Sequence, residues 1–260
     1  IDKVNASLGN IDAGDSIVFR RGDTFYGTLN ITKSGVDGSA IVFGAYGTGE
    51  KPIITGFTTI TSGWTSIGNG IYSRDISADQ QTNMVLIDGT QYAMGRWPKG
   101  TTYNTFESHD GSLSIRDNTL SSTPDWTGAD VVIRQNWWTQ TRFKIVNHDG
   151  STIVYNNGSN PDADAYMQDG FGYFIQNDLS TLYIDPAYGE WYHDATAQKL
   201  YVYFGAENPN TKNVKVATKG NLINDITSDY ITINNINFIG CTSTALSFQP
   251  YVCTNITIND

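Results

Sequence analysis

The sequence predicts an all-β protein, a right-handed parallel β-helix with an inserted β-rich module built like a sandwich or barrel. Short strand-like segments recur at a constant step near the N-terminus, and a doubled step returns near the C-terminus. The long stretch between them has no such step. Only 16% of the residues are charged, whereas there are 26 Gly and 15 Tyr, which suits short strands joined by tight turns.

The N-terminal repeat consists of apolar residues 12 positions apart, namely Ile17, Leu29, Ile41 and Ile53. Turn clusters such as RRGD and AYGTGEKP separate them. Near the C-terminus the step is 25 residues and relates Ile231 to Ile256 and Ile233 to Ile258. Because 25 is close to twice 12, we expect coils of two or three strands whose apolar positions stack. Strand–crossover chirality predicts the right-handed winding.

The two ends of the repeat differ. Val4, Leu8 and Ile11 have helical spacing and predict a short amphipathic helix that covers the open first edge of the β-helix. Asn235 and Asn255 suit its turns, because Asn tolerates left-handed backbone. The chain stops within a coil and has no initiator Met or signal peptide. We therefore expect it to be the N-terminal portion of a longer, processed protein.

The predicted organisation is a cap with the first coils at 1–62, an inserted module at 63–213 and resumed coils at 214–260. The module contains hairpin signals, with turns at Asp88-Gly89 and Asp149-Gly150. Another hairpin lies within EWYHDATAQKLYVYF, where Leu200, Val202 and Phe204 alternate.

Charge and composition exclude several classes of partner. A net charge of −10 and a pI near 4.6 argue against nucleic acid and anionic membranes, which select basic surfaces. No apolar run approaches the ~20 residues of a membrane span. Cys241 and Cys253 cannot make a disulfide scaffold; a bridge between them stays open, and two small buried residues are favoured.

The segment DAGDSIVFRRGDTFYGTLNITKSGVDGSAIVFGAYGTGEKPIITG, residues 12–56, resembles the opening of secreted right-handed β-helix proteins of the pectate-lyase-like superfamily. LIDGTQYAMGRWP, DWTGADVVIR and GEWYHDATAQKLYVYF resemble the insertion of β-helix glycoside hydrolases and bacterial relatives, and SDYITINNINFIGC resembles re-entry into the coils. One fold hosts many chemistries, so these motifs specify the architecture better than the reaction.

The resemblance implies a secreted, extracellular or cell-surface bacterial protein that acts on a plant or algal polysaccharide, and it favours a glycoside hydrolase. Its catalytic carboxylates are expected on later coils, beyond Asp260, and no catalytic residue is assigned here. Two alternatives stay open. One is a non-catalytic adhesin or stalk. The other is a polysaccharide lyase, for which Arg116, Arg134, Arg142 and Lys144 could form a local cationic patch.

The candidate carbohydrate-binding residues are Arg96, Trp97, Trp137, Trp138 and Trp191. Indole rings offer flat apolar faces on which sugar rings stack, although the same tryptophans could instead form the core of the module. Trp137 and Trp138 would point to opposite faces of a strand, so one of them is expected at the surface. For Arg96 an internal ion pair with Asp88 or Glu190 is favoured over a substrate contact.

Other polar groups have simpler interpretations. Glu190 with Asp194, and Asp225 with Asp229, are possible carboxylate pairs for glycoside hydrolysis, but solvated or turn-capping carboxylates are favoured. Asp162, Asp164 and Asp169 suggest calcium yet miss the EF-hand register, so no metal and no cofactor is predicted. His109, His148 and His193 lack metal-ligand spacing. YGTGEKPIITG matches no phosphate-binding loop and is predicted to be a structural corner.

Overall fold

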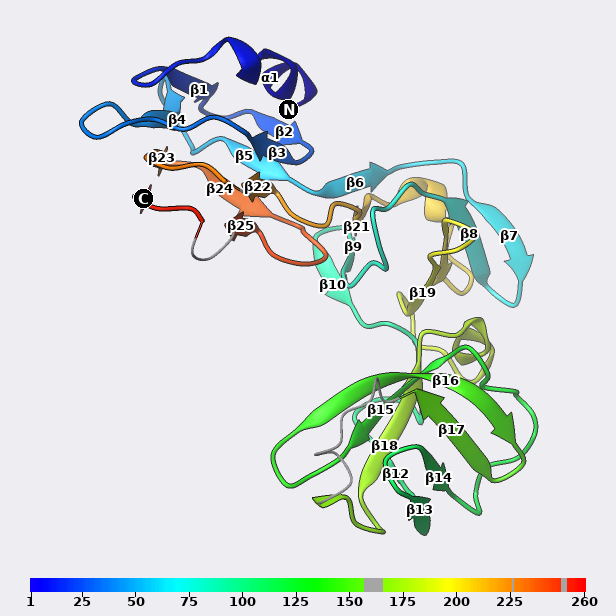
Figure 1. The fold of residues 1–260 in the computed structure, drawn as a ribbon. Coiled ribbons are helices and arrows are strands. Elements are labelled where there is room, and N and C mark those ends of the chain that lie inside the picture. Colours follow the sequence, from blue (N-terminus) through cyan, green and yellow to red (C-terminus); the bar gives the residue numbers. More distant parts are fainter. Residues whose placement is uncertain (157–165, 226, 249–251) are drawn as a thin grey trace. The chain divides into compact units, whose positions relative to one another are not determined.

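The computed structural model describes residues 1–156, 166–225, 227–248 and 252–260. The chain forms two compact units. The first comprises Ile1–Thr61, Ile76–Gln91 and Lys212–Asp260, and the second comprises Ser62–Asp75 and Tyr92–Thr211. The all-β prediction is confirmed, because the described residues contain a single α-helix, α1 (Asp2–Ser7), and many strands (Figure 1).

The elements of the first unit are α1 (Asp2–Ser7), η1 (Leu8–Asn10), β1 (Ser16–Arg20), β2 (Thr24–Tyr26), β3 (Leu29–Ile31), β4 (Ile41–Tyr46), β5 (Ile53–Thr55), β6 (Phe57–Ile60), β9 (Val85–Ile87), β10 (Thr90–Tyr92), β21 (Val214–Ala217), β22 (Ile223–Asp225), β23 (Ile231–Asn234), β24 (Asn237–Ile239), β25 (Leu246–Phe248) and β26 (Ile256–Asn259). Those of the second unit are β7 (Thr65–Gly68), β8 (Ile71–Asp75), β11 (Arg96–Trp97), β12 (Asn104–Thr105), β13 (Ser108–Asp110), β14 (Ser114–Arg116), β15 (Asp130–Arg134), β16 (Gln140–Asp149), β17 (Thr152–Asn156), β18 (Gly172–Gln176), η3 (Leu179–Tyr183), β19 (Trp191–Asp194), β20 (Lys199–Tyr203) and η4 (Pro209–Thr211).

Three sheets of the first unit are parallel in the part of the chain that the structure describes. Their strand orders are β1-β4-β23-β26, β2-β5-β24 and β3-β22-β25. Followed along the chain, β1 to β5 enter the three sheets in a fixed cycle, and β22 to β26 resume the same cycle after the interruption. Leu29, Ile41, Phe43, Ile223, Ile231 and Ile233 from these sheets are buried in one core.

The two predicted repeats have different outcomes. Ile231 pairs with Ile256 and Ile233 with Ile258, so the 25-residue step is the register of the ladder. The 12-residue step is not, because Ile53 pairs with Thr24 in the second sheet whereas Leu29 pairs with Ile223 in the third. Each cycle uses three strands, and turns of unequal length shift the register.

Left-handed backbone marks the turns. Asn235 and Asn255 have φ of 55° and 56°, as predicted. Gly47 and Gly49 are left-handed too, with φ of 85° and 108°, and they turn the chain between β4 and β5. YGTGEKPIITG is thus a structural corner, as the sequence predicts.

The N-terminal helix covers an edge strand, as predicted. Leu8 is buried in the core, and Val4 and Ile11 pack against it. Asn5 donates from Nδ2 to the carbonyl of Thr28 at 2.8 Å, and its Oδ1 accepts from the amide of Asn30 at 3.0 Å. These bonds satisfy backbone groups of the edge strand β3 that would otherwise be open to pairing with another chain.

One predicted boundary is wrong. The segment Ile76–Gln91 belongs to the first unit and not to the inserted module expected at 63–213. Its strand β9 pairs antiparallel with β21, where Val85 lies opposite Val216, and β21 also pairs with β6. The hairpin turn at Asp88-Gly89 is confirmed, because both residues have positive φ and β9 pairs with β10. The hairpin belongs to the first unit because β9 also pairs with the distant strand β21.

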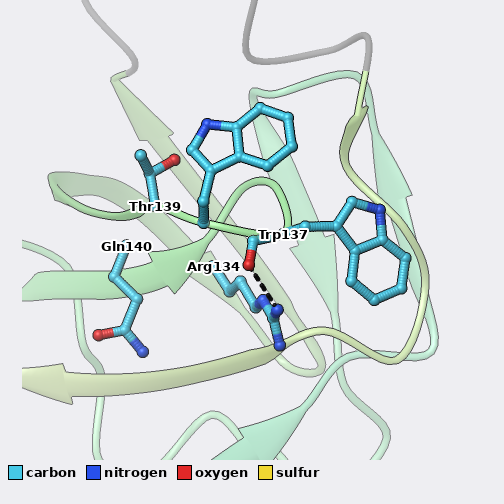
Figure 2. A pocket seen from close by; sticks show the side chains of 5 residues that line it. Arg134, Trp137, Thr139 and Gln140 are labelled. Atoms are coloured by element: carbon cyan, nitrogen blue, oxygen red, sulfur yellow. Dashed lines mark hydrogen bonds between the residues drawn. The ribbon is translucent and has the colours of Figure 1, made fainter.

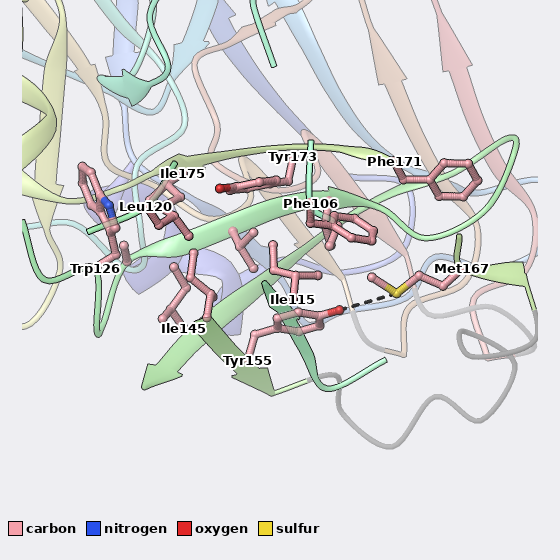
Figure 3. Packing of buried hydrophobic residues seen from close by; sticks show 14 residues of the cluster. Phe106, Ile115, Leu120, Trp126, Ile145, Tyr155, Met167, Phe171, Tyr173 and Ile175 are labelled. Atoms are coloured by element: carbon pink, nitrogen blue, oxygen red, sulfur yellow. Dashed lines mark hydrogen bonds between the residues drawn. The ribbon is translucent and has the colours of Figure 1, made fainter. Parts of the chain in front are cut away.

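The second unit contains two antiparallel sheets. The smaller has the order β19-β20-β8-β7, and the larger has a path β11-β18-β15-β16-β17-β14-β13 with β12 paired to β18. The hairpins predicted around Asp149-Gly150 and within EWYHDATAQKLYVYF are confirmed. Figure 3 shows the core of the larger sheet, where Trp126, Tyr155, Tyr173 and Phe106 pack with aliphatic residues of its strands.

Cys241 and Cys253 are not joined by a disulfide, and both are half-buried rather than buried. Within the described ranges, no helix is both long and apolar enough to cross a membrane.

Candidate functional site

Residues 135–139 connect β15 to β16 and carry two adjacent tryptophans; we call this segment the tryptophan loop. Asn136 organises it with its side chain. Its Oδ1 accepts from the amide of Trp138 at 3.0 Å, and from the amide and hydroxyl of Thr139, each at 2.7 Å. An Asn side chain that bonds its own backbone in this way replaces backbone turn bonds, so the loop has a defined shape.

Both tryptophans are exposed, Trp137 by 57% and Trp138 by 70%. The prediction that they lie on a strand and point to opposite faces is wrong, because β15 ends at Arg134 before them. Trp137 packs edge-on against Phe171, with ring centroids 5.3 Å apart, and Trp138 packs against Tyr166 at 5.8 Å. The two adjacent indoles together form an exposed apolar patch, and contiguous apolar patches are typical of interaction sites.

Arg134 supports the loop (Figure 2). Its Nε donates to the carbonyl of Asn136 at 3.1 Å and its Nη2 to the carbonyl of Trp137 at 2.8 Å. Its guanidinium also lies 5.1 Å from the ring centroid of Phe171. Arg134, the two tryptophans, Thr139 and Gln140 line a pocket of about 360 Å³. We call it the tryptophan pocket.

Arg96 and Trp97 form β11 and do not line the tryptophan pocket. The predicted ion pair of Arg96 with Asp88 or Glu190 is wrong: Asp88 lies 3.8 Å from Lys212 and Glu190 lies 2.6 Å from Lys99. Arg96 instead donates to the carbonyls of Pro98 and Thr102, and its guanidinium lies 3.7 Å from the ring centroid of Phe174. Burial lowers the pKa of Arg96, but an arginine stays charged in proteins.

Trp97 is half-buried and stacks on the buried Trp126, with centroids 5.8 Å apart. It lines a separate pocket of about 320 Å³ with Pro124, Thr119 and Ser121 among others. Trp191 is only 1% exposed, and its Nε1 donates to the carbonyl of Tyr92 at 2.9 Å. In this structure Trp191 is therefore a core residue whose ring offers no free face to a sugar.

The carboxylates singled out in the sequence stabilise turns or pair with cations. Asp194 accepts from the amides of Thr196 and Ala197, and Asp229 accepts from the amide and hydroxyl of Thr254. These two carboxylates cap turns, which is the role that the sequence favoured. Glu190 is instead buried and bonded to Lys99. The side chain of Asp225 is outside the described part.

Of the suggested calcium ligands, Asp162 and Asp164 lie outside the described residues. Asp169 lies 2.6 Å from Nδ1 of His109. Within the described ranges, no group of three or more His, Cys, Asp or Glu residues is placed to hold a metal ion.

Strand alternation places four cations on the outward side of the neighbouring strands β11, β18, β15 and β16, away from the core; we call this side of these four strands the cationic face. Val131 and Ile133 of β15 point into the core, so Arg134 points outward. The cross-strand register adds residues of β11 and β16 to the same side. The four cations are Arg96, Arg134, Arg142 and Lys144.

The predicted cationic patch is wrong in one residue, Arg116. Arg134, Arg142 and Lys144 come together on β15 and β16 as expected, but Arg116 lies on β14, which β17 separates from β16. Arg96 takes its place. Sequence reasoning missed that Arg96 joins these cations, and it also missed Asn136 and Phe171, although Asn is a residue type that favours turns.

The partners of these cations differ. Nζ of Lys144 lies 2.7 Å from Oδ1 of the buried Asp130. Arg142 donates from Nε and Nη2 to the amide oxygen of Gln176 at 3.0 and 2.9 Å, in the amide orientation that satisfies both side chains. None of Arg96, Arg134 and Arg142 has a carboxylate partner among the described residues.

No protein-family model matches the chain, and no curated protein matches it. A solved structure described as the complex of XylC with xylose is similar, with a TM-score of 0.46 and 15% sequence identity. The similarity covers 93% of this chain and 32% of the XylC chain, so this chain spans about a third of the length of that protein.

Proposed function

We propose that this chain belongs to a secreted polysaccharide-active protein, a glycoside hydrolase acting on a plant or algal glycan, and that its tryptophan loop binds the glycan. The observation that carries the proposal is the exposure of Trp137 and Trp138, at 57% and 70%, on a loop that internal hydrogen bonds hold in shape. If the two adjacent indoles served only as core residues of the module, they would be buried.

The chemistry of the pocket suits a sugar. An indole ring offers a large, rigid apolar face with few rotatable bonds, so a pyranose ring stacks on it at a low entropic cost. Thr139 and Gln140 line the same pocket and carry donors and acceptors that match sugar hydroxyls. Apolar faces with a few polar groups at their edge are the usual composition of ligand sites.

The first unit is proposed to be the start of a right-handed parallel β-helix. The fixed cycle of β1 to β5 and β22 to β26 through three parallel sheets supports it, as does the strong chirality of parallel crossovers. A winding of this kind presents long open faces along which a polymer can lie.

The binding test uses the full chain. Affinity electrophoresis against a panel of xylan, arabinan, galactan, mannan and polyuronates identifies the glycan, and titration calorimetry then measures the affinity. We expect Trp138→Ala and Trp137→Ala each to weaken binding at least tenfold, because stacked aromatic groups dominate such interfaces. Tyr46→Ala removes an aromatic ring of the first unit that is 52% exposed and is expected to leave the affinity unchanged.

Binding and hydrolysis are separated by a second measurement on the longest available form of the protein. Release of reducing ends from the bound polysaccharide supports a hydrolase, and release of unsaturated products supports a lyase. Binding without release supports an adhesin. Retention of full affinity by the Trp137→Ala/Trp138→Ala double variant would overturn the proposed role of the loop.

A further inference from the structure

The cationic face keeps three guanidinium groups without a carboxylate partner among the described residues, on a chain whose net charge is −10. Like charges on one face repel each other. The chain has 26 acidic residues that could have neutralised these guanidinium groups, so leaving them without carboxylate partners calls for an explanation. Guanidinium groups recognise carboxylates and tetrahedral oxyanions through paired hydrogen bonds. We propose that the cationic face binds the anionic groups of an acidic polysaccharide, its carboxylates or sulfate esters.

Arg142 is the principal anion-binding residue. Its side chain is exposed, and Gln176 takes only part of its five N–H donors. Gln176 is itself buried, so the bond between the two fixes the guanidinium against a rigid part of the sheet. The remaining donors are therefore oriented before a ligand binds, which lowers the entropic cost of binding.

Arg96 supplies a second fixed guanidinium. The carbonyls of Pro98 and Thr102 hold it, and its Cζ lies over the Phe174 ring, 3.7 Å from the centroid, and 5.2 Å from the centroid of Tyr103. In the sheet register Arg96 pairs with Gln176, the residue that also bonds Arg142. The two guanidinium groups thus flank the same position on the cationic face.

The cationic face continues into the tryptophan pocket. Arg134 ends β15 and Gln140 begins β16, and both line that pocket. Arg142 follows Gln140 by two positions on the same side of β16, a rise of about 7 Å. A glycan stacked on the tryptophans can therefore present a neighbouring acidic sugar to Arg142. The inference rests on the proposed function and names its substrate class.

The test compares ligands that share a backbone and differ in charge. The probes are polygalacturonate, its fully methyl-esterified form, and a sulfated galactan with its desulfated form, each titrated into the full chain at low and high NaCl. We expect tighter binding of at least one anionic form than of its neutral counterpart. We also expect that preference to shrink at high salt, because salt screens exposed charges.

Three variants locate the effect. Arg142→Gln and Arg96→Gln are each expected to weaken binding of the anionic form roughly tenfold, the size of one charge-assisted contact, and to leave the neutral form unaffected. Arg142→Lys should recover part of the loss, because it retains the charge without the planar fork. Arg20→Gln makes the same change of net charge on the first unit and is expected to have no effect.

The outcomes separate the two proposals. Equal affinity for the charged and neutral forms, or equal losses with Arg142→Gln and Arg20→Gln, overturns the acidic-sugar inference. If Trp138→Ala still weakens binding of the neutral form, the proposed role of the tryptophan loop survives that result. No binding of any probe or any polysaccharide in the panel overturns both. The relative affinities of the uronate and the sulfated galactan decide which anion is recognised.

Discussion

Nη2 of Arg134 donates a hydrogen bond to the carbonyl oxygen of Trp137 across 2.8 Å, while the same guanidinium lies 5.5 Å from the centroid of the Trp137 ring. One side chain therefore restrains both the backbone and the ring of a residue proposed to stack on sugar. Arg134 acts as a positioning residue for the tryptophan loop in addition to its place on the cationic face.

Replacing Arg134 tests that positioning role. In Arg134→Ala the loop loses two backbone acceptor bonds, so we expect weaker binding of neutral glycans and faster acrylamide quenching of tryptophan fluorescence. Arg134→Lys keeps the charge without the planar fork that holds both carbonyls, and it should give an intermediate result. Quenching that is identical in all three proteins would contradict the positioning role, because a merely electrostatic contribution leaves loop mobility unchanged.

Asn136 offers a second test of loop shape. Asn136→Asp keeps the oxygen that accepts from Trp138 and Thr139, whereas Asn136→Ala loses all three bonds. We therefore expect Asn136→Asp to keep most of the glycan affinity and Asn136→Ala to lose it, with both folded by circular dichroism. Equal affinity of the two variants would show that the turn bonds do not shape the site.

Asn5 should contribute to the stability of the first unit through the edge of β3. Asn5→Ala removes a donor and an acceptor that satisfy backbone groups, and each such bond contributes about 1 kcal/mol. We expect the free energy of unfolding to fall by roughly 1–2 kcal/mol in urea titrations. Ser7→Ala removes a hydroxyl of the same helix that donates to the carbonyl of Lys3; it serves as the control and should have a smaller effect.

Asp229 should make the first unit acid-sensitive. Hydrogen bonds from the hydroxyl and amide of Thr254 lower the pKa of Asp229 below its usual 3.8. The folded state thus favours the carboxylate, so this stabilisation is complete above about pH 4 and is lost as the pH falls through the lowered pKa. We expect Asp229→Asn to flatten the dependence of the melting temperature on pH below 4, whereas an unchanged profile would contradict the assignment.

Lys99 and Glu190 form an ion pair in which both side chains are largely buried, with exposures of 21% and 12%. Nζ of Lys99 lies 2.6 Å from Oε2 of Glu190 and also donates to the carbonyl of Thr181. Lys99→Met leaves a buried carboxylate uncompensated and should destabilise the second unit by about 3–5 kcal/mol. The Lys99→Met/Glu190→Leu double variant should recover most of this loss in thermal unfolding, and a double variant as unstable as the single one would refute the explanation.

Local features of the sequence were reliable guides. The turn at Asp149-Gly150, the hairpin around Leu200 and Val202, and the amphipathic helix at Leu8 are formed as predicted. Each depends on neighbouring residues, whose backbone preferences and alternation act within a few positions. The 25-residue step is confirmed as well, because it places Ile256 opposite Ile231 in the same ladder.

Burial of individual side chains could not be predicted in the same way. Trp191 begins β19 and Trp138 follows β15, yet Trp191 is 1% exposed and Trp138 is 70% exposed. The difference depends on where β15 ends and on which residues pack around each indole. Arg96 likewise reaches Phe174, which is 78 positions away in the sequence, through a strand pairing that no local pattern specifies.

The all-β character of this protein, its hairpins and the spacing of its C-terminal repeat can be read from the sequence, because they follow from period-2 alternation and turn chemistry along the chain. The pairing of segment 76–91 with β21, the exposure of the tryptophan loop and the position of Arg96 and Arg142 on either side of Gln176 are visible only in the folded protein. Those relationships depend on which distant strands pair, and pairing is selected by the burial of whole sheet faces rather than by any single residue.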